Sequence, residues 1–407
     1  MIGALQLGAA YLALVLLTGS GPESGPDEHR LELPAKSAST ISVGHPYHGK
    51  LKHGVKLPDE GSHHIVQRST KARRWNYGTT YLIRAVLVAA ERVNRDLPGG
   101  VPLEVGNLSK KGGGDIKLSM SHNTGRDVDI AYYTATSDGT STTSHYHKFA
   151  ADGRSKGAPT RYQLDIARNW AWVRAMVTSQ EAETQWVIVA PYIERLLLEH
   201  AKRAGEPDWL LRQAELVMML PSWAKLHDNH IHLRVLCSPE DWKRGCNNGG
   251  PVWSWNTKMV AAMDAELDTL RPELKSDDAD HQVKALRMIA KRGLGIAVPD
   301  VAPLLQSANA TVRAQALKTV GSLLTEANAM SVLKIARWCD QDAAVQLLTK
   351  AIALAGPDAL PTARELLDGR HPVKTADLSR KDRKKLRKSA KRIITRFANV
   401  AGGAVDG

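Results

Sequence analysis

The sequence of 407 residues predicts an α+β domain over residues 41–256 and an all-α region over residues 281–370. Between Ser42 and Trp255 the chain carries nine of its ten Trp residues and mixes alternating apolar patterns with helical ones. After Trp255 aromatic residues become rare, and Ala, Leu and Val recur at helical spacing. The strands of the first region are separated by helices and irregular segments without a regular βαβ alternation, which favours an α+β fold over an α/β fold.

Composition and charge exclude several classes of protein. Hydrophobic residues make up 43% of the chain and charged residues 24%, which excludes a wholly disordered, collagen-like or disulfide-dense protein. The formal net charge is +13, but the segment from Arg380 to Arg396 alone contains ten Lys or Arg and one acid, Asp382. Because the positive charge is concentrated there and no nucleic-acid-binding motif accompanies it, we expect no nucleic-acid partner.

The N-terminus resembles a segment that directs export. Residues 2–17 are apolar with one exception, and small residues follow them. This pattern predicts a signal peptide or N-terminal anchor over residues 1–20 and a polar linker over residues 21–40. The expected location is therefore the periplasm, with membrane association if the segment stays uncleaved. A mis-assigned start is the alternative, because the first Lys or Arg is Arg30 and the usual basic start is missing.

Apolar spacing predicts individual elements of the α+β domain. The helix expected over residues 79–96 has one apolar stripe, formed by Leu82, Ala85, Val86, Ala89 and Val93. A second helix is expected over residues 191–204, where Pro191 occupies the first turn and Gly205 ends the helix. Strand patterns occur in four segments, residues 102–105, 127–133, 185–189 and 230–236. Together these elements predict a small antiparallel sheet flanked by helices.

The all-α region has a weak internal repeat. The apolar pattern that begins at Val283 returns at Val312 and, less clearly, at Val345. Spacings of 29 and 33 residues are typical of stacked helix pairs of the HEAT type, whose surface could bind a protein partner. A plain helix bundle without repeat ancestry is the alternative. Residues 257–280 are expected to form a linker helix before this region.

The basic segment near the C-terminus predicts a helix within a tail over residues 371–407. Its Lys and Arg residues are most simply a solvated helix face. Alternatively, they attract the protein to an anionic membrane or an acidic wall polymer, because each cation near such a surface contributes on the order of 1 kcal/mol.

Histidines concentrate in the run His227-Asp-Asn-His230-Ile-His232-Leu-Arg234. Successive side chains of a strand alternate between faces, so His230, His232 and Arg234 project from one face while the apolar residues between them enter the core. Two imidazoles two residues apart stand about 7 Å from each other, close enough to share a metal site. The alternative is a pair of exposed or hydrogen-bonded histidines on a sheet.

The case for a metal is strengthened by a second cluster, Ser121-His122-Asn-Thr-Gly125-Arg126-Asp127-Val-Asp129. Gly125 permits a turn between His122 and Asp129, and Asp129 shares one face of the predicted strand with Asp127. The two clusters together offer His, Asp and His ligands. Three such ligands with one open coordination position are typical of a catalytic zinc ion. The sequence therefore predicts one Zn2+ per chain.

In this order the motifs resemble those of the penicillin-insensitive murein endopeptidases. These belong to a wider group of zinc peptidases that includes the lysostaphin-type and D-Ala-D-Ala metallopeptidases. The central match is H-x6-D, followed about a hundred residues later by H-x-x-H-x-H-x-R, and the resemblance covers about residues 41–256. Supporting matches are Ser42-Val-Gly44, Gly49-Lys-Leu51, Gly54-Val-Lys-Leu57-Pro58, Arg73-Arg74-Trp75, Cys237-Ser-Pro-Glu-Asp241, Gly245-Cys246 and Trp253-Ser-Trp255.

The resemblance implies a role for each residue of the two clusters. It implies that His122, Asp129 and His232 bind zinc, that His230 is the catalytic histidine beside the metal, and that His227 is a further active-site histidine. The implied reaction is hydrolysis of the D-alanyl cross-links between peptide stems of peptidoglycan. A metal-activated water and a histidine acting as general base and acid would carry it out.

Two positions bear on this assignment. Related peptidases without the His-rich motif often place a carboxylate three residues before the last ligand, where this chain has Asn229. No carboxylate base is available at that position, which favours His230 or His227 as the general base. Three residues before His122 the resemblance leads us to expect another His, but this chain has Ser119, which could change specificity or rate.

Arginines and cysteines near the two clusters complete the predicted site. Arg234 and Arg126 could bind a substrate carboxylate bidentately, although a surface salt bridge is the simpler role for Arg126. Cys237 and Cys246 lie nine residues apart in a Pro-, Gly- and Asn-rich stretch and could pair in an oxidising compartment.

Two other functions stay open at this level. A carboxypeptidase on the same scaffold would trim terminal D-Ala instead of cutting cross-links. A degenerate, non-catalytic protein would only bind the wall or partner proteins, with the all-α region as its working part. The presence of His122, Asp129, His230 and His232 argues against degeneracy, since loss of any one of them would suffice to inactivate the site.

Overall fold

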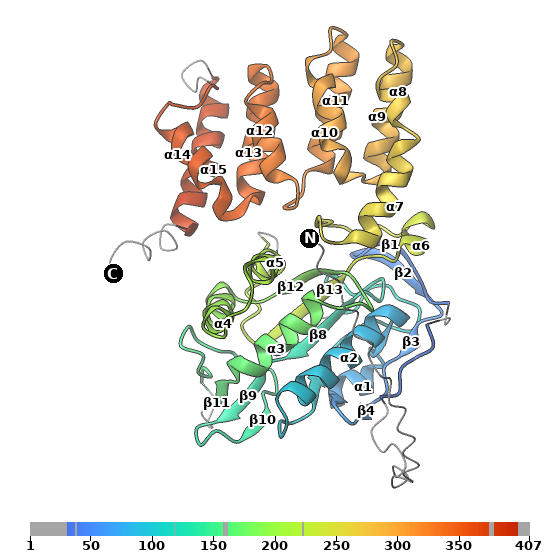
Figure 1. Ribbon diagram of the computed structural model, residues 1–407, viewed down its shortest axis with the longest axis vertical. Coiled ribbons are helices and arrows are strands. Elements are labelled where there is room, and N and C mark those ends of the chain that lie inside the picture. Colours follow the sequence, from blue (N-terminus) through green and yellow to red (C-terminus); the bar gives the residue numbers. More distant parts are fainter. Residues whose placement is uncertain are drawn as a thin grey trace, which may run out of the picture.

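The computed structural model describes residues 31–36, 39–117, 119–157, 162–221, 224–373 and 378–397. The expected signal peptide and most of the linker expected after it lie outside the described residues. Figure 1 shows sheets in the N-terminal half of the chain and a row of helices in the C-terminal half. The predicted order of a mixed α+β part followed by a helical part is therefore confirmed.

Six strands form the central sheet, in the order β12-β13-β8-β7-β5-β4. Their bounds are Glu60–Gly61 (β4), His64–Val66 (β5), Leu103–Val105 (β7), Asp127–Ala131 (β8), Thr184–Ile188 (β12) and His230–Val235 (β13). Neighbouring strands are antiparallel except β5 and β7, which are parallel. The sheet is thus larger than predicted and mixed, because two short strands that precede the first predicted one extend its edge.

The remaining strands form small sheets around the central one. The predicted strand over residues 127–133 divides at Tyr132, and its second part joins a separate three-stranded sheet. This sheet consists of β9 (Tyr133–Thr136), β10 (Ser141–Thr143) and β11 (Tyr162–Leu164). Two hydrogen-bonded pairs consist of β1 (Ile41–His45) with β2 (His48–Lys52), and β3 (Val55–Lys56) with β6 (Tyr77–Gly78).

Helices α2 (Thr80–Asp96) and α3 (Ile166–Val177) lie over one face of the central sheet (Figure 1). The Thr79 side chain caps α2 by accepting a hydrogen bond from the backbone N–H of Leu82, and the predicted apolar stripe of this helix is buried. Against α3 pack α4 (Pro191–Arg203) and α5 (Asp208–Met218). Two shorter helices are α1 (Arg68–Arg73) and α6 (Pro239–Lys243).

The side-chain alternation predicted for residues 230–236 is present in β13. Ile231 and Leu233 belong to the core that the helices cover. His230, His232 and Arg234 project from the opposite face, because successive side chains of a strand alternate. The acidic residues of β8 occupy the corresponding face of the neighbouring strand, so β8 and β13 carry these ionisable groups on the side away from α2 and α3.

Only helices occur after residue 256 in the described part of the chain, and none is both long and apolar enough to span a bilayer. The α-helices are α7 (Thr257–Asp268), α8 (Arg271–Leu274), α9 (Ala279–Arg292), α10 (Val298–Val301), α11 (Ala310–Leu323), α12 (Ala329–Ala336), α13 (Gln341–Leu354), α14 (Leu360–Leu367) and α15 (Arg380–Phe397). The 3-10 helices are η1 (Gly295–Ala297), η2 (Ala302–Gln306) and η3 (Gly356–Ala359). The three segments with the repeated pattern lie on α9, α11 and α13, and their repeat origin stays a prediction. We call residues 279–397 the helical region.

The helical region packs directly on the α+β part. The predicted disulfide between Cys237 and Cys246 is present, and we call residues 237–250 the disulfide loop. Trp242 of this loop shares one apolar core with α7 and the helical region, and its ring centroid lies 4.4 Å from the Arg292 guanidinium on α9. A second contact is the ion pair between Arg212 on α5 and Asp358 in η3. The segment expected as a linker is therefore a packed junction.

The basic helix α15 is attached to the helical region by a narrow apolar stripe. Leu386, Ala390 and Ile393 are buried where α15 contacts α13 and α14. Its exposed cations are Arg380, Lys381, Arg383, Lys384, Lys385, Arg387, Lys388, Lys391 and Arg392. The structure thus contains the helix predicted within the C-terminal tail, with its cations in solvent.

Candidate metal centre

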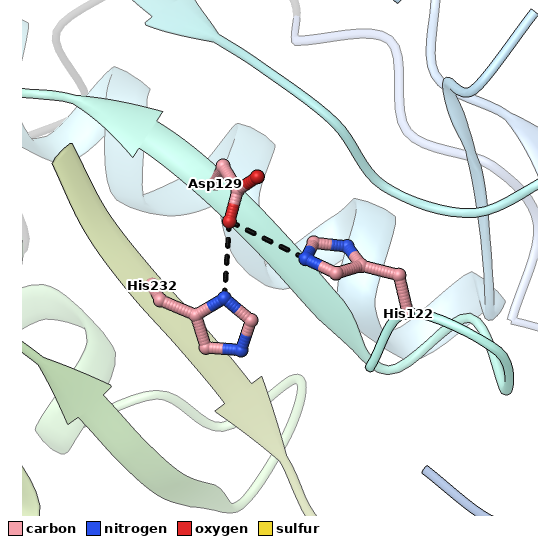
Figure 2. Close-up of side chains that lie close together, drawn as sticks. All are labelled: His122, Asp129 and His232. Atoms are coloured by element: carbon pink, nitrogen blue, oxygen red, sulfur yellow. Dashed lines mark hydrogen bonds and ion pairs between the residues drawn. The ribbon is translucent and has the colours of Figure 1, made fainter. Parts of the chain in front are cut away.

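Two neighbouring strands and the loop that precedes one of them bring three candidate ligands together. His232 on β13 is the cross-strand partner of Asp129 on β8, and His232 Nδ1 lies 3.0 Å from Asp129 Oδ1. Nε2 of His122, in the loop before β8, lies 3.3 Å from the same oxygen. The potential ligand atoms lie within 4.8 Å of one another, so the group could hold a metal ion (Figure 2).

The loop conformation places the His122 ring toward the sheet. His122 has a φ of 76° and Gly125 a φ of 71°, and this pair of left-handed residues forms the predicted turn. His122 is fully buried; its Nε2 faces Asp129 Oδ1 at 3.3 Å, while its Nδ1 makes no hydrogen bond with a residue that the structure describes. A buried imidazole without a well-formed hydrogen bond is unfavourable, and coordination of a metal beside the Asp129 carboxylate would relieve part of that cost. The residues therefore fit a metal ion.

Asp127 supports His232 from the side opposite Asp129. Its Oδ1 accepts a hydrogen bond from His232 Nε2 at 2.9 Å and another from Arg234 Nε at 2.6 Å. Asp127 and Arg234 are both fully buried. Metal-binding histidines commonly donate their second N–H to a carboxylate, which fixes the ring orientation and raises its basicity. The geometry therefore leaves His232 Nδ1 to face a metal while Asp127 holds Nε2.

The carboxylates also set the protonation of His232 in the metal-free protein. Burial disfavours the charged imidazole, but the hydrogen bonds to Asp127 and Asp129 outweigh burial and raise the pKa of His232 to about 9. Burial acts against ionisation of both carboxyls. Arg234 and His232 nevertheless hold the pKa of Asp127 below its usual range, and His122 and His232 do the same for Asp129. At neutral pH a metal ion must therefore displace a proton from His232.

Two further histidines lie beside the three candidate ligands. His230 Nε2 is 3.5 Å from Asp129 Oδ1, and the His227 ring centroid lies 4.9 Å from that of His230 and 5.6 Å from that of His232. Burial lowers the pKa of His230. Burial, with the neighbouring His232 and His230, lowers the pKa of His227 to about 3. Both rings are neutral at neutral pH and can accept a proton.

Tyr146 belongs to the surroundings of the site, and the sequence reasoning missed it. Its ring stacks on His230, with centroids 5.3 Å apart and an interplanar angle of 26°. His145 and Tyr146 have φ values of 44° and 62°, a strained backbone for residues other than glycine. The Tyr146 hydroxyl approaches Gly106 so closely that a Cβ at that position would lie 1.9 Å from it. The only available signal was an aromatic run in a loop, residues 145–147.

Both arginines that were predicted to bind a substrate carboxylate are buried. Arg126 is fully buried and does not form a surface salt bridge, since its guanidinium donates hydrogen bonds to the main-chain oxygens of Val235 and Asn247. Arg234 is also fully buried and bonded to Asp127. In this arrangement both guanidinium groups bond to partners within the protein. Both join segments that lie far apart in the sequence.

A buried His–Asp–His group with neutral histidines beside it is a combination typical of metallopeptidases. The family model of the penicillin-insensitive murein endopeptidases matches residues 42–280, more than half of the chain, and the chain therefore belongs to this family. It is a peptidoglycan-hydrolysing metallopeptidase. A comparison with curated proteins found no match. The family match contains all three candidate ligands and ends at the first residues of α9, so nearly all of the helical region lies beyond it.

Proposed function

We propose that the protein is a zinc-dependent endopeptidase that hydrolyses the D-alanyl cross-links between peptide stems of peptidoglycan. The observation that carries this proposal is the buried group of His122, Asp129 and His232, with His230 and His227 beside it. We propose Zn2+ as the metal, one per chain, because two imidazoles and one carboxylate with an open position are typical ligands of catalytic zinc.

The proposed mechanism divides the work between the metal and the side chains. A bound Zn2+ would supply Lewis acidity to activate water and polarise the amide carbonyl. His230, neutral and 3.5 Å from Asp129, would accept the proton of the attacking water and return it to the leaving amine. Stacking on Tyr146 restricts the orientation of the His230 ring. His227 is the second candidate for the proton transfer, since its ring packs against both other histidines.

The buried arginines favour an endopeptidase over a carboxypeptidase. A carboxypeptidase requires a cation that binds the terminal carboxylate of its substrate. Arg126 and Arg234, the sequence-based candidates for that role, are fully buried and hydrogen-bonded within the protein. An interior peptide bond needs no such cation. The complete ligand group likewise favours an active enzyme over a non-catalytic wall-binding protein.

Digestion of cross-linked muropeptide dimers by the full-length protein tests this function, with products identified by mass. We expect monomers with the mass of one added water, no cleavage after chelation, and recovery on adding Zn2+. The Asp129→Ala variant should lose bound metal and activity together, because it deletes a charged ligand, whereas Asp152→Ala, at an exposed position, should retain both. Release of terminal D-Ala alone would favour the carboxypeptidase, and full zinc content in Asp129→Ala would exclude the proposed ligand set.

We propose that the protein acts in the periplasm, because its substrate lies outside the cytoplasm and its disulfide requires an oxidising compartment. Export would use residues 1–20, followed by a linker over residues 21–40. We further propose that the domain over residues 41–256 catalyses the reaction. The helices after it would offer a surface to a protein partner, and the cations of α15 would attract an anionic membrane or wall polymer.

A further inference from the structure

A cavity of about 670 Å³ lies between the disulfide loop and the helical region. Trp186, Trp242 and Asn248 line it from the α+β part, while Lys291 and Glu326 line it from the helical region. Its volume is in the range of sites that bind small molecules or short peptides. Because the family match ends near residue 280, one wall of this cavity is built by residues outside the matched segment.

A series of side-chain neighbours connects the cavity with the metal centre. Trp186 on β12 is the cross-strand partner of Arg234 on β13, so both project from the same face of the sheet. Gly249, which also lines the cavity, packs against Pro46 in the turn between β1 and β2. The next residue of that turn, Tyr47, holds its ring 5.5 Å from the Arg234 guanidinium. Arg234 in turn supports the candidate ligands through its carboxylate partner.

The polar groups of the cavity are suited to a ligand that carries both charges. Trp186 is 1% exposed and Asn248 is 6% exposed, and neither Trp186 Nε1 nor Asn248 Nδ2 donates a hydrogen bond to any residue in the described part of the chain. Buried donors without acceptors are unfavourable, so a ligand oxygen would stabilise them. Lys291 adds a cation for a carboxylate. Burial raises the pKa of Glu326, and an ammonium group beside it would favour its ionised form.

We propose that this cavity is an accessory site for an un-cross-linked peptide stem of murein, whose carboxylate faces Lys291 and the two donors and whose free ammonium faces Glu326. This inference rests on the proposed murein endopeptidase function. Hydrolysis of a cross-link amide adds one water and leaves a carboxylate on one stem and an amine on the other. A stem whose other end takes part in no cross-link then carries both free groups. Such stems accumulate where the enzyme has acted, and the site would retain the enzyme on the opened network.

Calorimetric binding of a muropeptide monomer with a free amine to the full-length protein tests the site without requiring turnover. Ala327 is exposed and lines the cavity, so Ala327→Trp should fill it and weaken binding at least about tenfold, equivalent to about 1.4 kcal/mol. The matched control is Ala308→Trp, at an exposed loop position of the helical region outside the cavity, which should bind like the unmodified protein. Cleavage of soluble dimers should continue at an unchanged kcat in both variants.

A charge test uses two lysines of the same helix. Lys291→Glu should weaken binding, whereas Lys284→Glu, on α9 but outside this cavity, should not. Acetylation of the monomer's amine should also weaken binding to the unmodified protein. Glu326→Gln should bind the acetylated and the free-amine monomer equally, because the carboxylate that faces the ammonium is gone. Equal binding by the unmodified protein, Ala327→Trp and Lys291→Glu would overturn the inference even if dimers are cleaved. A lack of cleavage with these binding differences intact would instead refute only the proposed enzymatic function.

Discussion

The carboxylate of Asp127 offers a sharp test of how the metal centre is held. It accepts hydrogen bonds from His232 Nε2 at 2.9 Å and from Arg234 Nε at 2.6 Å inside a fully buried environment. Asp127→Asn keeps an oxygen at this position but removes its charge. We expect the variant to fold less stably by about 3–5 kcal/mol, because the buried Arg234 loses its ionised partner.

The effect of Asp127→Asn on metal affinity depends on pH, because the substitution has two consequences that oppose each other. At pH 7, below the pKa of about 9 of His232, a metal ion must displace a proton from this ring, and this competition weakens metal binding. Asp127→Asn lowers that pKa and so removes part of this penalty. The variant also loses the orienting carboxylate, which is worth about 10- to 100-fold in metal affinity. Above pH 9 only the loss of the orienting carboxylate affects metal affinity. Near pH 7 the lowered pKa of His232 partly offsets that loss.

Zinc affinity should therefore be measured in chelator-buffered solutions at pH 7 and pH 9.5. We expect Asp127→Asn to bind zinc about 10- to 100-fold more weakly than the unmodified protein at pH 9.5, with a smaller difference at pH 7. Asp241→Asn is the matched control, because Asp241 is 2% exposed but bonds Ser42 and Tyr81 instead of a candidate ligand. A deficit of the same size at both pH values, or in the control, would refute the reasoning.

Three further outcomes follow from the same structure. His230→Ala should keep its zinc but lose about 10²- to 10⁴-fold in turnover of soluble dimers; a loss below about threefold would transfer the proton-transfer role to His227. Deletion of residues 269–407 should give an insoluble or unstable protein by circular dichroism, because the apolar core of the helical region includes the disulfide loop, and a soluble, active fragment would contradict this. Reversing the charges of Lys384, Lys388 and Lys391 should abolish salt-sensitive binding to anionic vesicles or sacculi while leaving hydrolysis unchanged, and unaltered binding would leave α15 as only a solvated helix.

The elements with several periods of apolar repetition were predictable from the sequence. The expected helix over residues 79–96 corresponds to α2, and the expected strands over residues 185–189 and 230–236 correspond to β12 and β13. The strands β3 to β6 could not be found, since strands of two or three residues show no alternation and take their places from the pairing of their neighbours. For the same reason the sheet was predicted too small.

Within the site, strand alternation could predict which residues share a face but not how they are bonded. It placed His232 with Arg234 on one face of its strand and Asp129 with Asp127 on one face of another, and the pairing of β13 with β8 brings these faces together. It could not show that Arg126 is buried, because the main-chain oxygens that its guanidinium bonds lie 109 and 121 residues further along the chain. Tyr146 was missed for a similar reason, since its stacking on His230 depends on a strained loop conformation without a sequence signature.

The helical region is better understood as part of the enzyme's structure than as an appended module. One of its contacts, Arg292 on Trp242, involves the disulfide loop, while the other, Arg212 with Asp358, involves α5. Two separated contacts restrict rotation about the junction more strongly than one. The shared apolar core also means that movement of the helices would expose buried side chains of the α+β part. The shared core and the two contacts therefore hold the wall of the cavity that the helical region forms against the disulfide loop.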